Sequence, residues 1–447
     1  MRFVIIGGDA AGMSAASRAK RNQPDMEVIV LEQTADVSYS ACGMPYNIAE
    51  PDREIEDLVV RHAHVFREKQ GIDLRIGHRA EAIDPAARTV SGRTVNGDAF
   101  QLSYDKLLIA TGASPIIPPL PGFDQEGVFG LKSLEDGRKL KAFIAERQVK
   151  KAVILGMGYI ALEMCEALRS RDIEVAMVKP RPVLLLWMNE KLSAMVKEEI
   201  DRHDVGIYSG HEVKAIEKAG DALRVICSDL ELDAQMVVVA IGVTPNSRIA
   251  EDAGIALGLQ KSIAVDRALL TSAADIYSAG DCADAYHVVT GQKTWIPLAL
   301  RANRGGWAVA DTITGKEVSL QGVAGTAVFK VFDLQVARTG LSVKEARDAG
   351  FDPAEVVIES RTRAHAHPGS SKLGVEMVGD KRTGLLLGVQ MVGREGAAHR
   401  IDAPAVALHA KLTVEAFSEC DLAYAPPFSP VWDPMLTAAT QLLKKMG

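Results

Sequence analysis

The stretch Arg2-Phe-Val-Ile-Ile-Gly-Gly-Asp-Ala-Ala-Gly12 decides the fold of this 447-residue chain. Its apolar residues predict a buried parallel strand, and its glycines predict a tight turn into a helix from Met13 to about Arg21. A second apolar strand, Glu27–Leu31, then ends in Glu32. This order is typical of a dinucleotide-binding unit, in which the helix N-terminus receives a pyrophosphate and the acid a ribose hydroxyl. One position departs from the fingerprint, because Asp9 replaces its middle glycine.

A second unit of the same kind follows residue 150. Its parts align with those of the first, so Lys179 falls where Glu32 fell, with Arg181 two residues later. An acid at this place suits a ribose hydroxyl, whereas basic residues suit a 2′-phosphate. We therefore predict FAD in the first unit and NADPH or NADH in the second, with NADPH favoured. The alternative is that both basic residues are solvated turn charges. The parts are the strand Lys151–Leu155, the turn Gly156-Met-Gly-Tyr-Ile-Ala161, a helix over Glu163–Arg171 and the strand Glu174–Val178.

Three further strands end in small residues and glycine, which lets the backbone pass close to a cofactor. Leu107–Gly112 ends in Thr-Gly, and Val237–Gly242 repeats a glycine ending after the second unit, so both predict crossings between domains. Ile276–Asp281 delivers Asp281 beyond a glycine, and we predict that this acid bonds the ribityl or phosphate region of a flavin. The alternative for such an aspartate is a turn or a cap.

Thiol chemistry is expected from the stretch Val37-Ser-Tyr-Ser-Ala-Cys-Gly-Met-Pro-Tyr46. Its small residues, glycine and proline predict a loop that runs into a helix, with Cys42 at the positive helix end. Backbone N–H groups and the helix dipole favour an anion there, so we expect a lowered thiol pKa and a nucleophilic thiolate. The alternative is a packed, inert cysteine.

Composition excludes several classes of protein. The apolar fraction of 47% and the charged fraction of 24% are those of an ordinary globular protein, long enough for two to four domains. A net charge of −7 predicts neither nucleic-acid nor anionic-membrane binding. No apolar run approaches the roughly 20 residues that span a bilayer, and the N-terminal run meets Gly7-Gly8 without a signal cleavage site. Five cysteines without CxxC spacing argue against a metal site or a disulfide framework and favour the reducing cytoplasm.

Together these motifs resemble the FAD-dependent pyridine nucleotide–disulfide oxidoreductases. Within them the chain resembles the single-cysteine branch of coenzyme A-disulfide reductases, NAD(P)H persulfide and polysulfide reductases, NADH oxidases and NADH peroxidases. The resemblance runs nearly end to end, through Pro297–Arg304 and Tyr424–Pro434. Dithiol relatives carry a second cysteine where this chain has Val37, so Cys42 must work alone. Ala10 stands where oxidases and peroxidases usually have histidine, which favours a sulfur substrate.

The resemblance also implies which residues contact the cofactors. They are the turn residues of both units, the acid or bases at the second strand ends, the glycine endings and the start of the Pro297 motif. The predicted set is Gly7, Gly8, Ala11, Gly12, Glu32, Thr111, Gly112, Gly156, Gly158, Tyr159, Ile160, Lys179, Arg181, Gly242, Gly280, Asp281, Pro297, Leu298 and Ala299.

Substrate contacts are implied in the same way. Arg18 and Arg21 lie three apart on one predicted helix face, where they can meet phosphates or remain solvated. Ala41 replaces a frequent asparagine, and Trp432 replaces a lysine of some coenzyme A-disulfide reductases, so coenzyme A itself is less favoured than a smaller persulfide or polysulfide. The predicted substrate-binding set is Ser14, Arg18, Arg21, Ser38, Tyr46 and Arg301.

Beside Cys42, two catalytic groups are predicted near the C-terminus. Tyr424 matches the tyrosine that reaches the partner subunit's cysteine in the family, where a phenol can donate a proton to the leaving sulfur. His365 and His367 replace a tyrosine pair before Pro-Gly, and His367 is the predicted acid–base group; the alternative is a polar loop.

The expected fold is α/β: two Rossmann-like nucleotide-binding domains, for FAD and NAD(P), plus a C-terminal α+β dimerisation domain. The FAD-binding domain takes residues 1–113 and 246–322, the NAD(P)-binding domain 114–245 and the dimerisation domain 323–447. In the last of these, strands are expected near Thr326–Phe332, Val336–Thr339, Val356–Ser360, Lys372–Val378 and Leu385–Val392, and a helix near Ala403–Lys411.

The predicted function is hydride transfer from NAD(P)H through FAD to Cys42, which reduces a small disulfide or persulfide such as coenzyme A disulfide, coenzyme A persulfide or polysulfide. The expected assembly is a homodimer with a shared active site. One alternative is a water-forming NADH oxidase that uses a Cys42 sulfenate. Another is an NAD(P)H-responsive redox sensor, and a reductase of a small iron–sulfur protein is less favoured because Cys42 would have no task.

Overall fold

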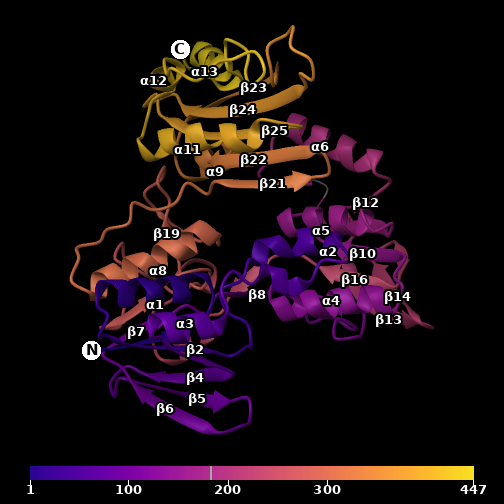
Figure 1. The fold of residues 1–447 in the computed structure, drawn as a ribbon. Coiled ribbons are helices and arrows are strands. Elements are labelled where there is room, and N and C mark those ends of the chain that lie inside the picture. The colour runs from indigo at the N-terminus through magenta and orange to yellow at the C-terminus, as the bar shows by residue number, and fades with distance from the viewer. Residues whose placement is uncertain (182–183) are drawn as a thin grey trace.

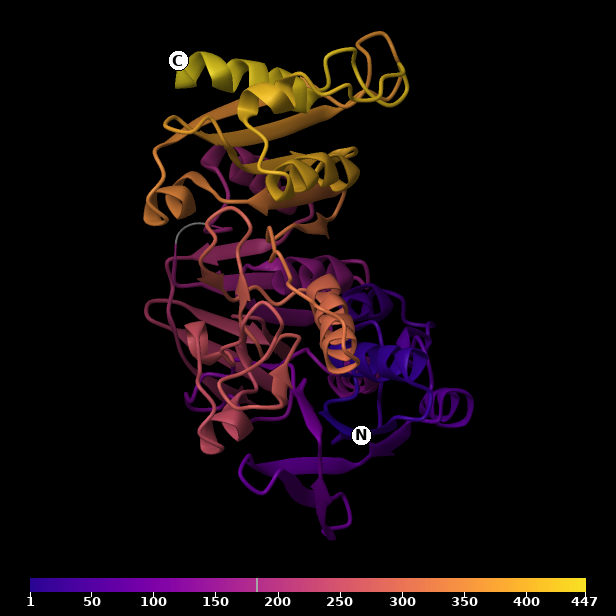
Figure 2. The same cartoon turned by 90° about the vertical axis from the view of Figure 1, so that its left-hand side faces the viewer.

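The computed structural model describes residues 1–181 and 184–447, and its chain is arranged around three five-stranded sheets (Figure 1). The expected α/β architecture with two parallel sheets and a separate C-terminal unit is confirmed. Figures 1 and 2 show the C-terminal part, in yellow, at one end of the molecule and the N-terminal residues, in indigo, toward the other.

The first sheet is parallel and has the order β18-β7-β1-β2-β3. Its central strand pairs on both sides, which explains why its residues are apolar without alternation. The strands are β1 (Arg2–Ile6), β2 (Glu27–Glu32), β3 (Asp73–Ile76), β7 (Lys106–Ile109) and β18 (Ile276–Ser278). The helices of this part are α1 (Ala10–Asn22), α3 (Ala63–Gln70), α7 (Arg248–Asp252) and α8 (Ala299–Ile313), and α1 packs along α8. The helix α2 (Met44–Ala49) leaves this part and packs against α5 (Tyr159–Arg169).

The second sheet repeats this design in the order β12-β11-β10-β16-β9. It consists of β9 (Val128–Phe129), β10 (Lys151–Leu155), β11 (Glu174–Lys179), β12 (Gly206–Ser209) and β16 (Met236–Val239), with the helices α4 (Leu134–Glu146), α5 (Tyr159–Arg169) and α6 (Glu190–Arg202). Each parallel sheet is accompanied by a small antiparallel one. These are β4 (His78–Asp84), β5 (Thr89–Thr94) and β6 (Ala99–Ser103), and β13 (Val213–Ala219), β14 (Ala222–Cys227) and β15 (Glu231–Ala234).

The two expected crossings lie side by side. β8 (Ala113–Pro115) pairs antiparallel with β17 (Val243–Pro245), so the chain leaves and re-enters the first part at one place. Farther on, β19 (Ala285–Tyr286) and β20 (Lys293–Thr294) form a short pair before α8.

The third sheet is antiparallel, with the order β21-β22-β25-β24-β23. All five expected strands are present, some longer than expected: β21 (Ala327–Val331), β22 (Leu334–Gly340), β23 (Pro353–Arg361), β24 (Lys372–Asp380) and β25 (Leu386–Gly393). The expected helix is α11 (Asp402–His409), beside α9 (Val343–Asp348), α10 (Ala397–Arg400), α12 (Val414–Ser418) and α13 (Pro434–Met446).

One apolar core crosses the boundaries between these parts. It contains Met44 and Ile48 of α2, Ala161 and Leu162 of α5, and Phe329 of β21, all nearly or fully buried. Each large aliphatic or aromatic side chain buried in this way contributes about 1.5–3 kcal/mol. The helix after the cysteine loop, the second nucleotide-binding unit and the C-terminal sheet are therefore packed as neighbours.

Within residues 1–181 and 184–447, no helix combines the length and the hydropathy that a transmembrane span requires. The same residues contain no group of three or more His, Cys, Asp or Glu side chains arranged to hold a metal ion.

Candidate active site

The first glycine turn has no room for side chains. Gly7 has a φ of 112°, and a Cβ on it would lie 2.2 Å from the carbonyl oxygen of Ala110. A Cβ on Gly12 would lie 1.9 Å from the carbonyl oxygen of Gly7. α1 starts at Ala10, three residues earlier than expected, because the turn ends at its N-cap Asp9. The free N–H groups of its first turn can therefore face a pyrophosphate.

Glu32 closes this turn at the end of β2. Its Oε2 accepts a hydrogen bond from the Gly8 N–H at 2.8 Å, and its Oε1 accepts two from Thr34, at 2.7 and 2.8 Å. A carboxylate oxygen can accept two hydrogen bonds. Among the described residues Oε2 accepts one, so it retains an acceptor site for a ribose hydroxyl, and these residues fit the adenosine half of FAD.

The second turn is built in the same way. Gly156 has a φ of 117°, and a Cβ on it would lie 2.3 Å from the carbonyl oxygen of Ala240. A Cβ on Gly158 would meet no heavy atom of the described chain within 4 Å, which leaves an open cradle. The expected helix start at Glu163 is wrong, because Gly158 is the N-cap and α5 begins at Tyr159. The Tyr159 ring lies 4.9 Å from that of Phe329.

Lys179 and Glu32 occupy equivalent positions. Leu31 pairs with Ile6 and Val178 with Leu155, and each charged residue follows directly. The Lys179 ammonium donates to the carbonyl of Leu184 at 2.8 Å, and burial, together with Arg181, lowers its pKa. Arg181 is exposed. Their roles toward a 2′-phosphate stay predictions.

Cys42 lies in the 3₁₀ turn η1 (Ala41–Gly43), directly before α2, as expected. The loop is fixed by an antiparallel bridge between Tyr39 and Val59 and by the positive φ of 52° at Ser38. Val37, at the place of a second thiol, is 3% exposed. All five cysteines belong to the described part of the chain, and all are free.

The expected lowering of the Cys42 pKa is wrong for the polypeptide. Although the residue is exposed, the surrounding protein partly desolvates the thiol and raises its pKa, and the Glu163 carboxylate adds to the rise. Lys132 opposes it. The helix that follows Cys42 has six residues, so its dipole is small and desolvation outweighs it.

Glu163 is a residue that sequence reasoning missed. Its Oε1 accepts a hydrogen bond from the Tyr46 hydroxyl at 2.7 Å, so α5 reaches across to the helix that follows Cys42. Burial raises the pKa of Glu163, and the bond from Tyr46 lowers it. The available signal was its spacing of four residues from Tyr159, which puts both on one helix face.

Two further charged residues were missed or left without a role. Lys132 forms an ion pair with Asp281 at 2.8 Å, and no local pattern signals this because the partners are 149 residues apart. Asp9 accepts a hydrogen bond from the Tyr39 N–H at 3.3 Å, and burial raises the pKa of Asp9 to about 6. The remaining predicted glycines lie at turns, with φ of 70° at Gly112, 132° at Gly242 and 86° at Gly280. Thr111 donates to the Asn246 carbonyl, Ala11 lies in α1, Ile160 in α5, and Pro297, Leu298 and Ala299 lead into α8.

The predicted substrate residues mostly have partners within the chain. Arg18 binds both carboxylate oxygens of Asp311 at 2.9 Å, so it faces α8 rather than sharing an open face with exposed Arg21. Ser14 donates to Asn303 of the same helix at 2.6 Å. Arg301 donates to the carbonyls of Gly280, Ala283 and Asp284, which supports the loop that carries Asp281. The substrate roles of these residues stay predictions.

The predicted C-terminal groups lie in two loops that contact each other. The Ala364 N–H donates to the carbonyl of Pro426, which joins the His367 loop to the Tyr424 loop. Tyr424 is 48% exposed. Among the described residues, no hydrogen bond or ion pair links either loop to the Cys42 loop.

Comparison with known proteins identifies this arrangement. The family model described as pyridine nucleotide-disulphide oxidoreductase matches residues 1–306. The chain belongs to this family. The model of the dimerisation domain of the pyridine nucleotide-disulphide oxidoreductases matches residues 326–435. The chain is therefore an oxidoreductase of a family that uses FAD and NAD(P)H.

Similar members of the family are named for sulfur chemistry. The NAD(P)H sulfur oxidoreductase (CoA-dependent) of Pyrococcus furiosus is 38% identical over 99% of both chains. The NAD(P)H coenzyme A polysulfide/persulfide reductase of Pyrococcus horikoshii is 37% identical over 99% of this chain and 98% of its own. The structure of an NAD-dependent persulfide reductase from A. fulgidus has a TM-score of 0.96 and 36% identity, and covers 100% of this chain and 83% of its own.

Proposed function

We propose that this chain is an NAD(P)H-dependent reductase of low-molecular-weight disulfides or persulfides, in which Cys42 is the sulfur that meets the substrate. The observation that carries the proposal is a single free thiol at the start of α2, with Val37 buried where a resolving cysteine would stand. The names of the two Pyrococcus relatives and of the A. fulgidus structure support the same class of substrate.

FAD, when bound, supplies the chemistry that passes the hydride of NAD(P)H onward as an electron pair. The chain's own task is nucleophilic. The Cys42 thiolate attacks one sulfur of the substrate, the substrate S–S bond breaks, and the other sulfur leaves as a thiolate while a mixed disulfide forms on Cys42. A thiol with a raised pKa gives a more basic and intrinsically more nucleophilic thiolate. Burial and Glu163 therefore reduce the fraction of Cys42 that is present as thiolate, but they make each thiolate more nucleophilic.

Ala41 and Trp432 make coenzyme A less favoured on the sequence alone, but we propose it as the carrier of the substrate sulfur because the Pyrococcus relatives are named for it. Arg21 is the exposed candidate for a phosphate contact, whereas Arg18 is already paired with Asp311. Mass spectrometry of the purified protein tests this point. A coenzyme A adduct on Cys42 supports the proposal, and a sulfenate with a matching uptake of oxygen would favour the NADH oxidase alternative.

The decisive experiment is the Cys42→Ser variant. We expect it to keep its flavin and to lose turnover with coenzyme A disulfide and polysulfide by roughly 10³-fold or more, because the nucleophile is gone. Cys420→Ser is the matched control, since Cys420 is also free and partly exposed. Full turnover by Cys42→Ser would refute the proposal.

We also propose a cytoplasmic homodimer with an active site shared between subunits, in which Tyr424 serves the Cys42 of the other chain. The dimerisation-domain match supports the dimer, and the free cysteines suit a reducing compartment. Exposed Tyr424, Phe428, Val431 and Trp432 form the apolar segment available for the contact. Mixed dimers of inactive Cys42→Ser and Tyr424→Phe chains should regain part of the activity, because one of the two sites is then intact.

A further inference from the structure

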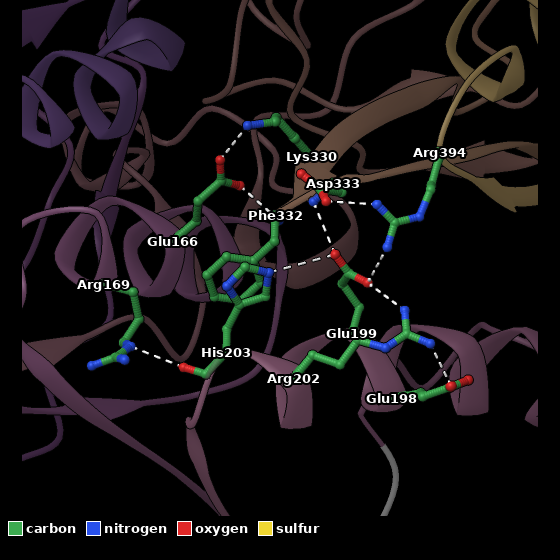
Figure 3. A network of polar contacts seen from close by, with 10 residues as sticks. All are labelled: Glu166, Arg169, Glu198, Glu199, Arg202, His203, Lys330, Phe332, Asp333 and Arg394. Carbon is green, nitrogen blue, oxygen red and sulfur yellow. Dashed lines mark hydrogen bonds and ion pairs between the residues drawn. The ribbon is translucent and has the colours of Figure 1, made fainter. Parts of the chain in front are cut away.

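Two carboxylates from the second nucleotide-binding unit bind the turn of the β21–β22 hairpin (Figure 3). Glu166 of α5 accepts a hydrogen bond from the N–H of Phe332 at 2.8 Å, and Glu199 of α6 accepts one from the N–H of Asp333 at 3.2 Å. Phe332 and Asp333 are the two turn residues between β21 and β22, whose last pair is Val331 with Leu334. We call this contact the hairpin clamp.

The turn that the clamp holds is strained. Phe332 has a φ of 50°, a left-handed conformation that two-residue hairpin turns normally assign to glycine or asparagine. Its ring is held by the imidazole of His203, which stacks on it with ring centres 3.8 Å apart and planes 7° from parallel. Lys330, one residue before the end of β21, forms an ion pair with Glu166. A bulky residue in this conformation persists only where its surroundings compensate for the strain.

Glu199 is the buried member of the clamp, with 1% of its side chain exposed. Besides the Asp333 N–H it accepts a hydrogen bond from Arg202 at 3.1 Å and pairs with Arg394 at 3.4 Å, and His203 lies 3.6 Å away. Removing a buried carboxylate that accepts several hydrogen bonds costs much folding free energy. While those bonds are intact, the carboxylate is held rigidly. Figure 3 shows these donors converging from α6, from the hairpin and from the segment after β25.

Phe329 connects the hairpin to Tyr159, which belongs to the predicted binding site of NAD(P)H. Phe329 of β21 is 6% exposed, and its ring lies 4.9 Å from that of Tyr159, the first residue of α5. Tyr159, Glu163 and Glu166 recur at spacings of four and three, so they lie along one face of α5. Along this face the helix contacts Phe329, then Tyr46 beside the cysteine loop, then the hairpin turn.

We propose that Glu166 and Glu199 are positioning residues for hydride delivery: by holding the β21–β22 turn, they keep Phe329 against Tyr159 and so shape the place where the nicotinamide of NAD(P)H meets the flavin. The proposal rests on the proposed function in that NAD(P)H delivers the hydride, and it takes Tyr159, a predicted cofactor contact of the second unit, as part of that site. It does not depend on the sulfur chemistry of Cys42. It assigns a catalytic consequence to two carboxylates of α5 and α6 through the C-terminal hairpin that they hold.

The test separates the two half-reactions of the holoenzyme in anaerobic stopped-flow experiments. NAD(P)H is mixed with the oxidised enzyme to follow loss of flavin absorbance, and the dithionite-reduced enzyme is mixed with ferricyanide to follow its return. Ferricyanide keeps the second measurement independent of Cys42, so a failure of the sulfur proposal does not affect the outcome. The variants are Glu166→Ala, Glu166→Gln and Glu199→Ala. The matched control is Glu198→Ala, because Glu198 also pairs with Arg202 but is 66% exposed.

We expect Glu166→Ala to slow flavin reduction by NAD(P)H about tenfold, which corresponds to about 1.4 kcal/mol of activation free energy. Reoxidation by ferricyanide and the flavin content should stay unchanged. Glu166→Gln should recover most of the rate, because its amide oxygen still accepts the Phe332 N–H. If Glu199→Ala does not yield folded protein, the Glu166 pair decides alone. An unchanged rate of flavin reduction in Glu166→Ala, or equal slowing of both half-reactions, would overturn the proposal.

Discussion

Asp9→Asn is the sharpest test of how burial acts at this site. Asp9 stands where the dinucleotide fingerprint has its middle glycine, occupies the N-cap position of α1 without a side-chain capping bond, and accepts the Tyr39 N–H. Burial raises its pKa from 3.8 to about 6, with Glu32 and Asp281 adding to the rise and the Tyr39 bond and Lys132 opposing it. Asparagine keeps an oxygen for the Tyr39 N–H but carries no charge.

The sign of the effect of pH on stability follows from the raised pKa of Asp9. Below pH 3.8 the carboxyl is protonated in both the folded and the unfolded chain and has no effect on stability. As the pH rises to about 6, the unfolded chain loses the proton first, so the wild-type free energy of unfolding falls, and above pH 6 the loss is complete. The asparagine variant does not suffer this loss. Its advantage is about 1 kcal/mol at pH 4.5 and about 3 kcal/mol at pH 7.5, at 1.36 kcal/mol per pKa unit.

Calorimetric melting of both proteins between pH 4.5 and pH 8 measures this advantage. The difference in melting temperature should grow up to about pH 6.5 and then stay constant, with Asp9→Asn the more stable protein. Asp52→Asn, a change at an exposed turn residue, is the control for an unspecific effect of charge removal. An advantage that is independent of pH, or a less stable variant at pH 7.5, would refute the reasoning.

Three further outcomes follow from the contacts. Glu163→Gln should lower the pKa of Cys42, because the variant removes a negative charge that raises it, and the pH dependence of alkylation by iodoacetamide measures this. An unchanged profile would show that Glu163 does not contribute to the raised pKa. Lys179→Ala should reduce kcat/KM for NADPH about tenfold more than for NADH, because one charged contact to a phosphate is worth about 1.5–3 kcal/mol. Equal losses would show that Lys179 does not contact the 2′-phosphate. Asp433→Ala should destabilise the chain by about 3 kcal/mol in urea unfolding, since it leaves the largely buried Arg400 guanidinium without its carboxylate and with only carbonyl partners. A loss under about 1 kcal/mol would contradict that.

Local patterns predicted the framework of the molecule well. Periodicity and spacing predicted the strands on both sides of each glycine turn and all five strands of the C-terminal sheet. They also predicted that Glu32 and Lys179 occupy equivalent positions. The helix starts were placed three or four residues late. In both units the helix begins directly at the turn, at Ala10 and Tyr159, because the turn residue itself serves as the N-cap.

The charged contacts of the site were not predictable in this way. Lys132 and Asp281 are 149 residues apart, and Arg18 and Asp311 are 293 apart, so no window of sequence contains both partners. A guanidinium or ammonium looks the same in the sequence whether it faces a substrate or a carboxylate of its own chain. Which partner it meets depends on how α1, α8 and the second unit pack.

The sequence by itself determined that two nucleotide units share the chain and that one cysteine lacks a resolving partner, because turn geometry, strand period and residue identity are local properties. Only the tertiary structure decided the direction of the Cys42 pKa, the contact between Glu163 and Tyr46, and the carboxylates on the β21–β22 turn. The physical reason is that desolvation and Coulomb interactions depend on every atom packed around a group. Those atoms come from segments that meet only when the chain has folded.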